Sequence, residues 1–250
     1  MRAWFAALLL MIMAGAGCQA EEVTLKTAYE NVEPKFIKYS PGNFGGLCVE
    51  LMSLISKDTG IRFRAKDGFV PKKRYLRDLE QGEVDVLFGL KKDVEREKWL
   101  VFGEPLYEVK YIALLNEVDS LEVRNAEDIR GLGKEGVVLT IFGAASADCL
   151  RGLGLTVDDG AKDVEAGIGK LLAKRGRLFV YQNLSTMYEL RKSKFKHTVR
   201  VVDLDMRKYE HYVVFSKMVD PELVRRINRS IVKLKKNGDW DKVTRKYLNQ

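Results

Sequence analysis

The sequence predicts an α/β protein in which short strands and helices alternate along most of the chain. Runs of alternating or continuous apolar residues, typical of strands, recur between segments whose apolar residues follow helical spacing. Glycine and proline residues separate these segments. With 46% hydrophobic and 10% aromatic residues, the composition is that of a globular chain. The alternation predicts sheets that are mostly parallel, with helices on both faces.

The first half of the chain predicts three strands and two helices. The strands are expected at residues 23–29, 61–66 and 84–88. One helix is expected where apolar residues recur at helical spacing from Leu47 to Ile55. A second helix should begin at Pro71 and end at Gly82, because proline favours the first helical position and glycine the position after the last.

The second half repeats this alternation. Strands are expected at residues 137–142, 177–182, 199–204 and 211–215, and helices near Ser146, at residues 166–176 and through Met187. The clearest helix of the sequence follows, with Asp220 as its cap, Pro221 at its first position and Gly238 at its end. A short helix is expected to end the chain.

The first twenty residues are typical of a secretory signal peptide. Arg2 provides a positive start, residues 3–13 form an uncharged apolar run, and small residues follow at 14–17. The run is shorter than the ~20 residues that a membrane-spanning helix needs, and no other stretch of the sequence qualifies. We favour cleavage after Ala20; the alternative is a lipoprotein in which Cys18 carries the lipid anchor. The sequence therefore predicts export to the periplasm.

The charge pattern argues against a nucleic-acid-binding protein, and the cysteine content argues against a disulfide. Arg2 is the one charged residue in the first twenty, so cleavage would lower the formal net charge from +8 to +7. The basic residues are dispersed among 35 acids, except at residues 191–197, which we interpret as a solvated helix end. Nucleic acid is therefore not expected as a partner. Cys48 and Cys149 are expected to be two separate small buried thiols and not a disulfide.

Three loops are candidates for a binding site, because ligands of parallel α/β sheets bind beyond the carboxyl ends of the strands. The loops that follow predicted strands in this way are residues 89–96, 143–146 and 182–183. In the first of them we expect Gly89 to turn the chain and Asp93 to cap a short helical turn. Because the loops come from two different sets of strands, we expect the site to lie between two lobes.

Four segments of the chain carry a family resemblance. They are "GGLCVEL" at 45–51, "LEQGEVDVLFG" at 79–89, "EREKWLVFGEPLYE" at 95–108 and "DPELVRRINRSIVKLKKNGDWDKVTRKYL" at 220–248. From about Val23 onward the chain resembles the periplasmic solute-binding proteins of the polar amino-acid type, the family 3 receptors of ABC importers. The resemblance implies a type II periplasmic binding protein, in which two α/β lobes joined by two crossover strands close on a small ligand.

The resemblance also implies where the lobes divide. Crossovers just after "EPLYE" and just before "HYVVF" give a first lobe of residues 21–108 plus 210–250 and a second lobe of residues 109–209. Both ends of the mature chain then lie in the first lobe. We expect a monomer without a cofactor, whose partners are a carboxylate-bearing small molecule and the membrane subunits of an ABC importer.

An arginine that binds the ligand's carboxylate is implied in the first lobe. In the family it ends a turn of the form Gly, Ser/Thr, Glu-Arg, and "GLKKDVER" matches Gly89 and Arg96 to this turn. Arginine suits the task because its planar guanidinium binds carboxylate through two parallel hydrogen bonds. The alternative is that Arg96 pairs with a nearby acid on the turn. Lys91 replaces the family's hydroxyl residue, so the site would take a second anionic group unless Lys91 points to solvent.

The second lobe is implied to contribute backbone donors. The family often has glycine followed by Ser or Thr at a helix start, where N–H groups receive the carboxylate, and here Gly143 and Ser146 match. The aspartate that binds the ligand's ammonium falls near Asn183, within one residue of Gln182 or Leu184, and an amide binds ammonium more weakly. Aromatic residues that match ligand-stacking regions, with core packing as the alternative, are Tyr29, Phe36 and Phe69.

An enzyme is the main rival class, because the same fold occurs as a dehydratase that acts on cyclohexadienyl acids. The sequence contains no Gly-x-Ser-x-Gly, His-Glu-x-x-His, paired CxxC or phosphate-binding loop, and neither His197 nor His211 lies beside a nucleophile motif. "GLGKEG" at 131–136 fits a dinucleotide pattern but precedes a strand, so we interpret it as a loop. A solute sensor that acts on a separate membrane partner is the second alternative.

Overall fold

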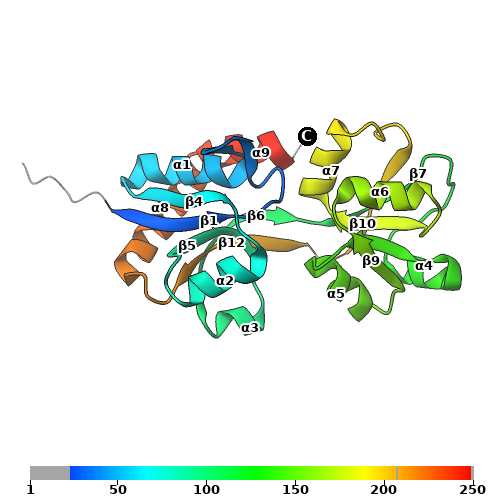
Figure 1. Cartoon of the computed structure of the whole chain (residues 1–250), viewed down its shortest axis with the longest axis horizontal. Helices are drawn as coiled ribbons and strands as arrows, with labels where there is room; N and C mark the ends of the chain where they lie inside the picture. The colour runs from blue at the N-terminus through cyan, green and yellow to red at the C-terminus, as the bar shows by residue number, and fades with distance from the viewer. Residues whose placement is uncertain (1–22, 207, 249–250) are drawn as a thin grey trace, which may run out of the picture.

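The structure is a computed structural model that describes residues 23–206 and 208–248. Figure 1 shows two α/β lobes that lie side by side and are connected by extended strands. The predicted signal peptide and Cys18 lie outside the described residues. Among the residues described, no helix is both long and apolar enough to cross a membrane.

The first lobe contains two neighbouring sheets. β1 (Thr24–Tyr29) pairs in parallel with β4 (Arg62–Phe69). β12 (Tyr209–Ser216) pairs antiparallel with β5 (Val86–Lys91) on one side and with β6 (Leu100–Val109) on the other. The carboxyl ends of β1 and β5 point toward the second lobe (Figure 1).

Helices cover both sides of these sheets. On one side α1 (Leu47–Thr59), α8 (Pro221–Lys236) and α9 (Asp239–Leu248) pack against each other, and on the other lie α2 (Lys72–Glu80) and α3 (Val94–Glu97) (Figure 1). A small hairpin of β2 (Ile37–Ser40) and β3 (Asn43–Gly45) precedes α1.

Local sequence explains where the helices begin. The carboxylate of Asp220 accepts a hydrogen bond of 2.8 Å from the amide of Glu222 at the start of α8, which confirms the predicted cap. Pro221 occupies the first turn, as expected. Pro71 stands at the cap position of α2, one residue before the first helical residue, Lys72.

The second lobe contains one five-stranded sheet. Its strands follow the order β11 (Val199–Asp203), β7 (Tyr111–Asn116), β10 (Leu178–Gln182), β8 (Val138–Ile141) and β9 (Val157–Ala161). β8 is parallel to both of its neighbours, and β7 is antiparallel to both of its own.

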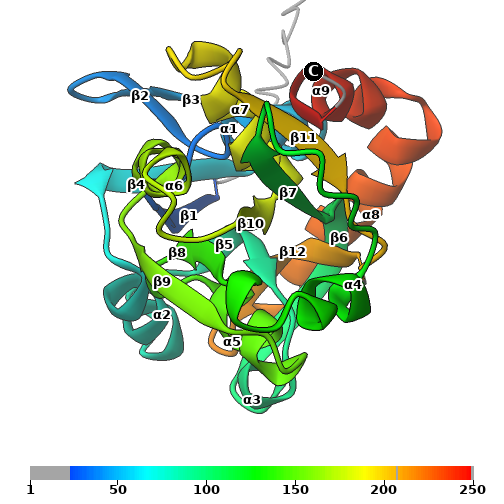
Figure 2. The same cartoon turned by 90° about the vertical axis from the view of Figure 1, so that its right-hand side faces the viewer.

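The helices of this lobe also lie on both faces of the sheet. Apolar residues of α6 (Val164–Leu172) and α7 (Asn183–Lys192) pack on one face, and those of α4 (Ala126–Gly131) and α5 (Ala145–Gly152) on the other. Figure 2 faces this lobe and shows the two pairs of helices on opposite sides of the strands. Residues 133–135 form a single 3₁₀ turn before β8, so "GLGKEG" lies in a connection, as predicted.

The α/β class with mixed sheets is confirmed, but the expectation of mostly parallel sheets is wrong. Of the eight strand pairs formed by the described residues, five are antiparallel. The reason lies in the strands that connect the lobes. The chain passes outward through β6 and β7 and returns through β11 and β12, so β6 pairs antiparallel with β12 and β7 with β11.

Each lobe has its own apolar core. The core of the first lobe joins distant parts of the chain, such as Leu51 of α1, Phe215 of β12 and Trp240 of α9. The indole Nε1 of Trp240 donates to the carbonyl of Leu106, 2.8 Å away, and ties α9 to the connecting strand β6. The cores of the second lobe form between residues 111 and 204. This arrangement supports the lobe division at residues 108 and 210, which we retain as a proposal.

Cys48 and Cys149, the cysteines among the described residues, are free thiols, as predicted. Cys48 is fully buried in α1, and burial raises the pKa of its thiol to about 12. Cys149 is half-buried in α5, so the expectation of full burial is wrong for this residue.

The lobes also touch through α7. Leu184, at its start, packs into the core of the first lobe. The hydroxyl of Ser185 donates to the carbonyl of Glu33, 2.6 Å away, and the ammonium of Lys192 lies 2.7 Å from the Glu33 carboxylate. These contacts join the start and the end of α7 to the first lobe.

Candidate ligand-binding cleft

A cleft of about 470 Å³ lies between the lobes and is lined by residues of both. It includes the segments that follow β5, β8 and β10, as predicted for strand ends of an α/β protein. Predicted site residues that line it are Phe69, Gly89, Lys91, Arg96, Gly143 and Ser146. Predicted site residues outside its lining are Tyr29, Phe36 and Asn183.

Gly89 does not end its strand, contrary to the prediction. β5 continues to Lys91, and its register against β12 shifts at Gly89, which forms a bulge. The φ angle of Gly89 is +82°, and a Cβ there would lie 2.6 Å from the hydroxyl of Tyr107 and 2.7 Å from Cδ of Lys35. Only glycine fits at this position, because the positive φ angle disfavours other residues and the close packing leaves no room for a side chain.

Arg96 is held in position by its own turn. The Asp93 carboxylate caps α3 by accepting from the Arg96 amide at 2.9 Å, which confirms the predicted cap, and lies 3.1 Å from the guanidinium Nε. Nη1 of Arg96 donates to the carbonyl of Lys91 at 2.7 Å. The side chain is 18% exposed and lines the cleft. Arg96 therefore does pair with a nearby acid, as one of the two alternatives predicted. Its Nη2 has no hydrogen-bond acceptor among the described residues.

Lys91 lies against the connecting strand. Its ammonium is 4.6 Å from the centre of the Tyr209 ring, at the start of β12, within the range of a cation–π contact. The residue is half-buried and lines the cleft. The alternative in which Lys91 points freely into solvent is therefore wrong.

A buried ion pair that sequence reasoning missed forms the wall beside Gly89. The ammonium of Lys35 pairs with the Glu30 carboxylate and donates to the carbonyl of Gly89 at 2.8 Å. The hydroxyl of Tyr75 donates to the same carboxylate at 2.7 Å. The side chains of Glu30 and Lys35 are only 16% and 8% exposed. The carboxylate is therefore largely occupied by partners within the protein.

Glu30 could have been predicted from its position in the sequence. It directly follows β1, so the strand-end rule applies to it as well as to the other loops. Its predecessor Tyr29 faces the opposite side, into the core, because neighbouring strand residues alternate between faces. No pattern marked Lys35, which lies in an irregular loop.

Glu30 is expected to make stability depend on pH. Burial alone would raise the pKa of Glu30, but the Lys35 charge and the bonds from Lys35 and Tyr75 outweigh it and lower the pKa below the ordinary 4.5. The contribution to the free energy of unfolding is thus complete above about pH 4.5 and is lost as the pH falls through the lowered pKa. Urea unfolding of wild type and Glu30→Gln at pH 7 and pH 3 checks this. We expect the difference between the two proteins to shrink at pH 3; a constant difference would contradict it.

His211 lies among the cations of the first lobe. Its ring packs against Tyr107 and Tyr209, with centroid distances of 5.1 and 5.5 Å. Burial, followed by the charges of nearby cations, lowers the pKa of His211 well below 6.5; these cations are Lys35, Lys91, Lys72 and Arg96. The imidazole is therefore neutral at physiological pH. Its Nδ1 is buried without a hydrogen-bond partner in the part of the chain described.

The start of α5 brings backbone donors from the second lobe to the cleft. Ala144 stands at the cap position and supplies no side-chain cap. The Ser146 hydroxyl lies 2.7 Å from Oγ1 of Thr140, so it is engaged within the lobe. The amides of Ala145 and Ser146 donate to no carbonyl of the described residues. A helix start with free N–H groups favours an anion, so Ser146 is suited to act through its amide and not its hydroxyl.

Asn183 lies at the connection between the lobes instead of in the cleft. Its side-chain oxygen accepts from the backbone N–H of Lys110 at 3.1 Å, and its backbone N–H donates to the carbonyl of Lys110 at 2.8 Å. The neighbours within the stated uncertainty, Gln182 and Leu184, both line the cleft. Gln182 is 6% exposed, and its side-chain oxygen has no hydrogen-bond partner among the described residues.

Two of the three predicted aromatic walls belong to the core. Tyr29 and Phe36 stack on each other with ring centres 4.8 Å apart, inside the first lobe. For these two residues the structure shows core packing, which was the alternative to ligand stacking. Phe69 lines the cleft, and its role in stacking on a ligand stays a prediction. It is joined there by aromatic residues that sequence reasoning missed, namely Tyr75, Tyr107, Phe142, Tyr181 and Tyr209.

Two α/β lobes with a cationic cleft between them form the architecture that the sequence predicts for a solute-binding protein. The model of the bacterial extracellular solute-binding proteins, family 3, matches residues 25–250. The chain belongs to this family, and the predicted resemblance is confirmed. A probable histidine-binding protein of Neisseria gonorrhoeae is 23% identical over 214 residues, which span 84% of this chain and 76% of that protein.

Solved structures confirm the two-lobed fold. The GluR0 ligand-binding core in complex with L-glutamate matches with a TM-score of 0.76 and 16% identity, over 91% of this chain and 99% of that one. The ancestral amino-acid-binding protein AncCDT-1, a precursor of cyclohexadienyl dehydratase, matches with a TM-score of 0.73 and 19% identity, over 90% and 95% of the two chains. At such identities the likeness shows the fold alone.

Proposed function

We propose that this protein is a periplasmic receptor that binds a small carboxylate-bearing solute between its lobes and delivers it to the membrane subunits of an ABC importer. The observation that carries the proposal is Arg96, whose guanidinium is fixed by Asp93 and the Lys91 carbonyl at the edge of the cleft. A guanidinium held in this way binds carboxylate with defined geometry. The histidine-, glutamate- and amino-acid-binding descriptions of the related proteins support a ligand of amino-acid size.

The proposed mechanism is closure of the two lobes on the ligand. Arg96 and Lys91 would hold the carboxylate from the first lobe, and the amides of Ala145 and Ser146 would reach it from the second. Both sets of contacts form only when the lobes approach each other. The ligand would therefore shift the open–closed equilibrium by its higher affinity for the closed state.

We propose binding and not catalysis, although the description of AncCDT-1 as a dehydratase precursor raises the alternative. Among the described residues, Glu30 is the one acid that lines the cleft. Its lowered pKa keeps it ionised, so it is poorly suited to donate a proton as a general acid. His211 also lines the cleft, but its pKa is lowered well below 6.5, so it is neutral, and its ring packs against Tyr107 and Tyr209.

A thermal-shift screen tests this function. The chain without residues 1–20 is unfolded and refolded to remove any ligand carried through purification. It is then heated with amino acids, dicarboxylates, aromatic acids and small peptides. A ligand at 100 times its dissociation constant stabilises the folded state by about 2.7 kcal/mol, which raises the midpoint clearly. We expect a shift from one class of carboxylate; no shift from any of them would overturn the receptor proposal.

A further inference from the structure

The charges that line the cleft are strongly unbalanced. Of the residues that the structure describes, five cations line it, four in the first lobe and one in the second: Lys35, Lys72, Lys91, Arg96 and Lys162. Glu30 is the one acid in the described lining, and Lys35 already neutralises it. Asp93, outside the lining, offsets part of the Arg96 charge. The cleft thus retains more positive charge than a single carboxylate would balance.

The cleft also lacks a carboxylate that would receive an ammonium group. The described residues of the second lobe that line it include no acid, and Gln182 offers a neutral amide oxygen. In the first lobe Glu30 is occupied by the Lys35 ammonium and the Tyr75 hydroxyl. An α-ammonium placed here would meet cations at short range without a compensating anion, which is unfavourable.

Two lysines are placed to bind a second anionic group. Lys72, an exposed residue that opens α2, lines the cleft, and no ion pair of the described residues joins it to an acid. Its proximity to other cations shows in its pKa, which is lowered by partial desolvation and then by the Arg96 charge. Among the described residues, the ion-pair partner of Lys162 in the second lobe is its sequence neighbour Asp163, at 3.9 Å, and the Lys162 side chain is 84% exposed.

We propose that the ligand is a small dicarboxylate without an ammonium group. One carboxylate binds Arg96 and Lys91, and the other binds Lys72, with Lys162 reaching it from the second lobe on closure. This inference rests on the proposed receptor function and specifies its ligand class. Phe69 and the tyrosines of the lining provide apolar surface for the carbon chain between the two carboxylates.

Calorimetric titration with matched compounds tests the inference. Succinate, glutarate and phthalate are the dicarboxylate probes. Aspartate and glutamate add one ammonium to the first two, and succinamate replaces one carboxylate of succinate by a neutral amide. We expect a dicarboxylate to bind at least about tenfold more tightly than its amino counterpart and than its monoamide.

The variant Lys72→Gln tests whether Lys72 binds the second carboxylate. Its control is Lys73→Gln, because Lys73 lies on the same helix but does not line the cleft. We expect Lys72→Gln to weaken dicarboxylate binding at least about tenfold and monoamide binding by a smaller factor, and we expect Lys73→Gln to leave both unchanged. If an amino acid binds as tightly as its dicarboxylate, or if both variants bind alike, the inference is overturned and the receptor function stands. If no probe and no amino acid binds, the receptor function itself is overturned.

Discussion

Replacing Arg96 with alanine is expected to lower ligand affinity at least about thirtyfold, which corresponds to about 2 kcal/mol. The variant removes a guanidinium whose orientation is fixed by Asp93 and by the Lys91 carbonyl, so neither water nor a neighbouring lysine reproduces its paired donors. The ion pair with Asp93 is partly exposed, and its loss should cost less than about 1 kcal/mol of folding stability. Titration of the compound identified by the thermal-shift screen measures the first effect, and urea unfolding the second.

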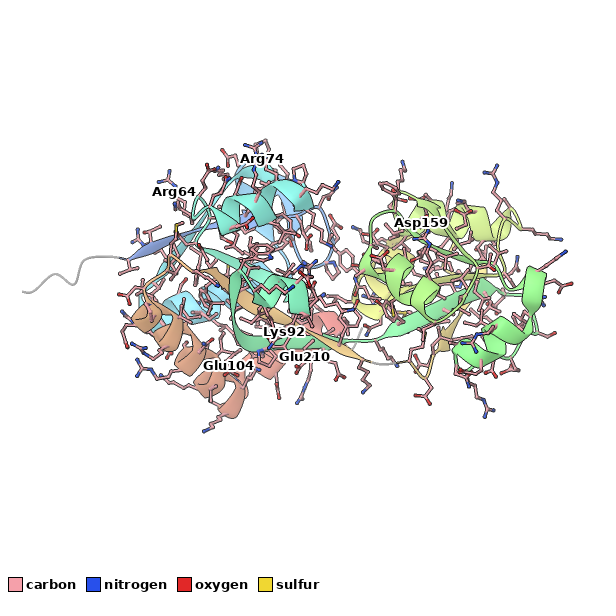
Figure 3. The ribbon with its side chains drawn as sticks, turned by 90° about the horizontal axis from the view of Figure 1, so that it is seen from below. Arg64, Arg74, Lys92, Glu104, Asp159 and Glu210 are labelled. Atoms are coloured by element: carbon pink, nitrogen blue, oxygen red, sulfur yellow. The ribbon has the colours of Figure 1, made fainter. Side chains whose placement is uncertain are left out.

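A matched control for this variant is Arg64→Ala. Arg64 lies on β4, exposed on the surface of the first lobe, and does not line the cleft (Figure 3). The control removes the same group and the same charge, so it reports any long-range effect of net charge on an anionic ligand. Equal affinities of Arg96→Ala and wild type would show that the carboxylate anchor is assigned to the wrong residue.

Replacing Lys35 with methionine is expected to destabilise the folded state by about 3–5 kcal/mol at pH 7. The Glu30 carboxylate would remain buried beside Gly89 without its cation, and only the Tyr75 hydroxyl would still donate to it. In this variant burial should raise the pKa of Glu30 above its unfolded value. The loss should therefore be smaller at pH 4 than at pH 7, because protonation removes the buried charge.

The double variant Glu30→Gln with Lys35→Met separates charge from packing. Without the carboxylate no unpaired charge is buried, so most of the lost stability should return. Urea unfolding of wild type, both single variants and the double variant at both pH values gives the coupling energy. Additive single-variant losses would contradict the account of a tightly coupled buried pair.

Most of the fold could be predicted from the sequence, because apolar periodicity and helix caps are local signals. Asp93, Asp220 and Pro221 occupy the positions that local rules assign to them. Strand direction is not a local property. The antiparallel pairing of β6 with β12 and of β7 with β11 depends on the path of the chain between the lobes, which no single segment specifies.

The candidate site could be predicted less well, for a related reason. Arg96 and Gly143 lie in loops whose position follows from the strands before them, and both line the cleft. Asn183 was one residue away from the lining, and a single step along the chain is enough to move a side chain from the cleft to the connection between the lobes. The Glu30–Lys35 pair depends on the course of an irregular loop, for which the sequence has no periodic signal.

Ligand-dependent closure is the central claim, and a distance between the lobes tests it most directly. Spin labels at Arg74→Cys and Asp159→Cys, which lie on different lobes (Figure 3), report this distance by pulsed electron resonance in a Cys149→Ser background. Cys48 can stay, since its buried thiol with a pKa of about 12 will not react with the label. We predict a shorter distance with the compound that gives the largest thermal shift. An unchanged distance at saturating ligand would contradict closure of the lobes.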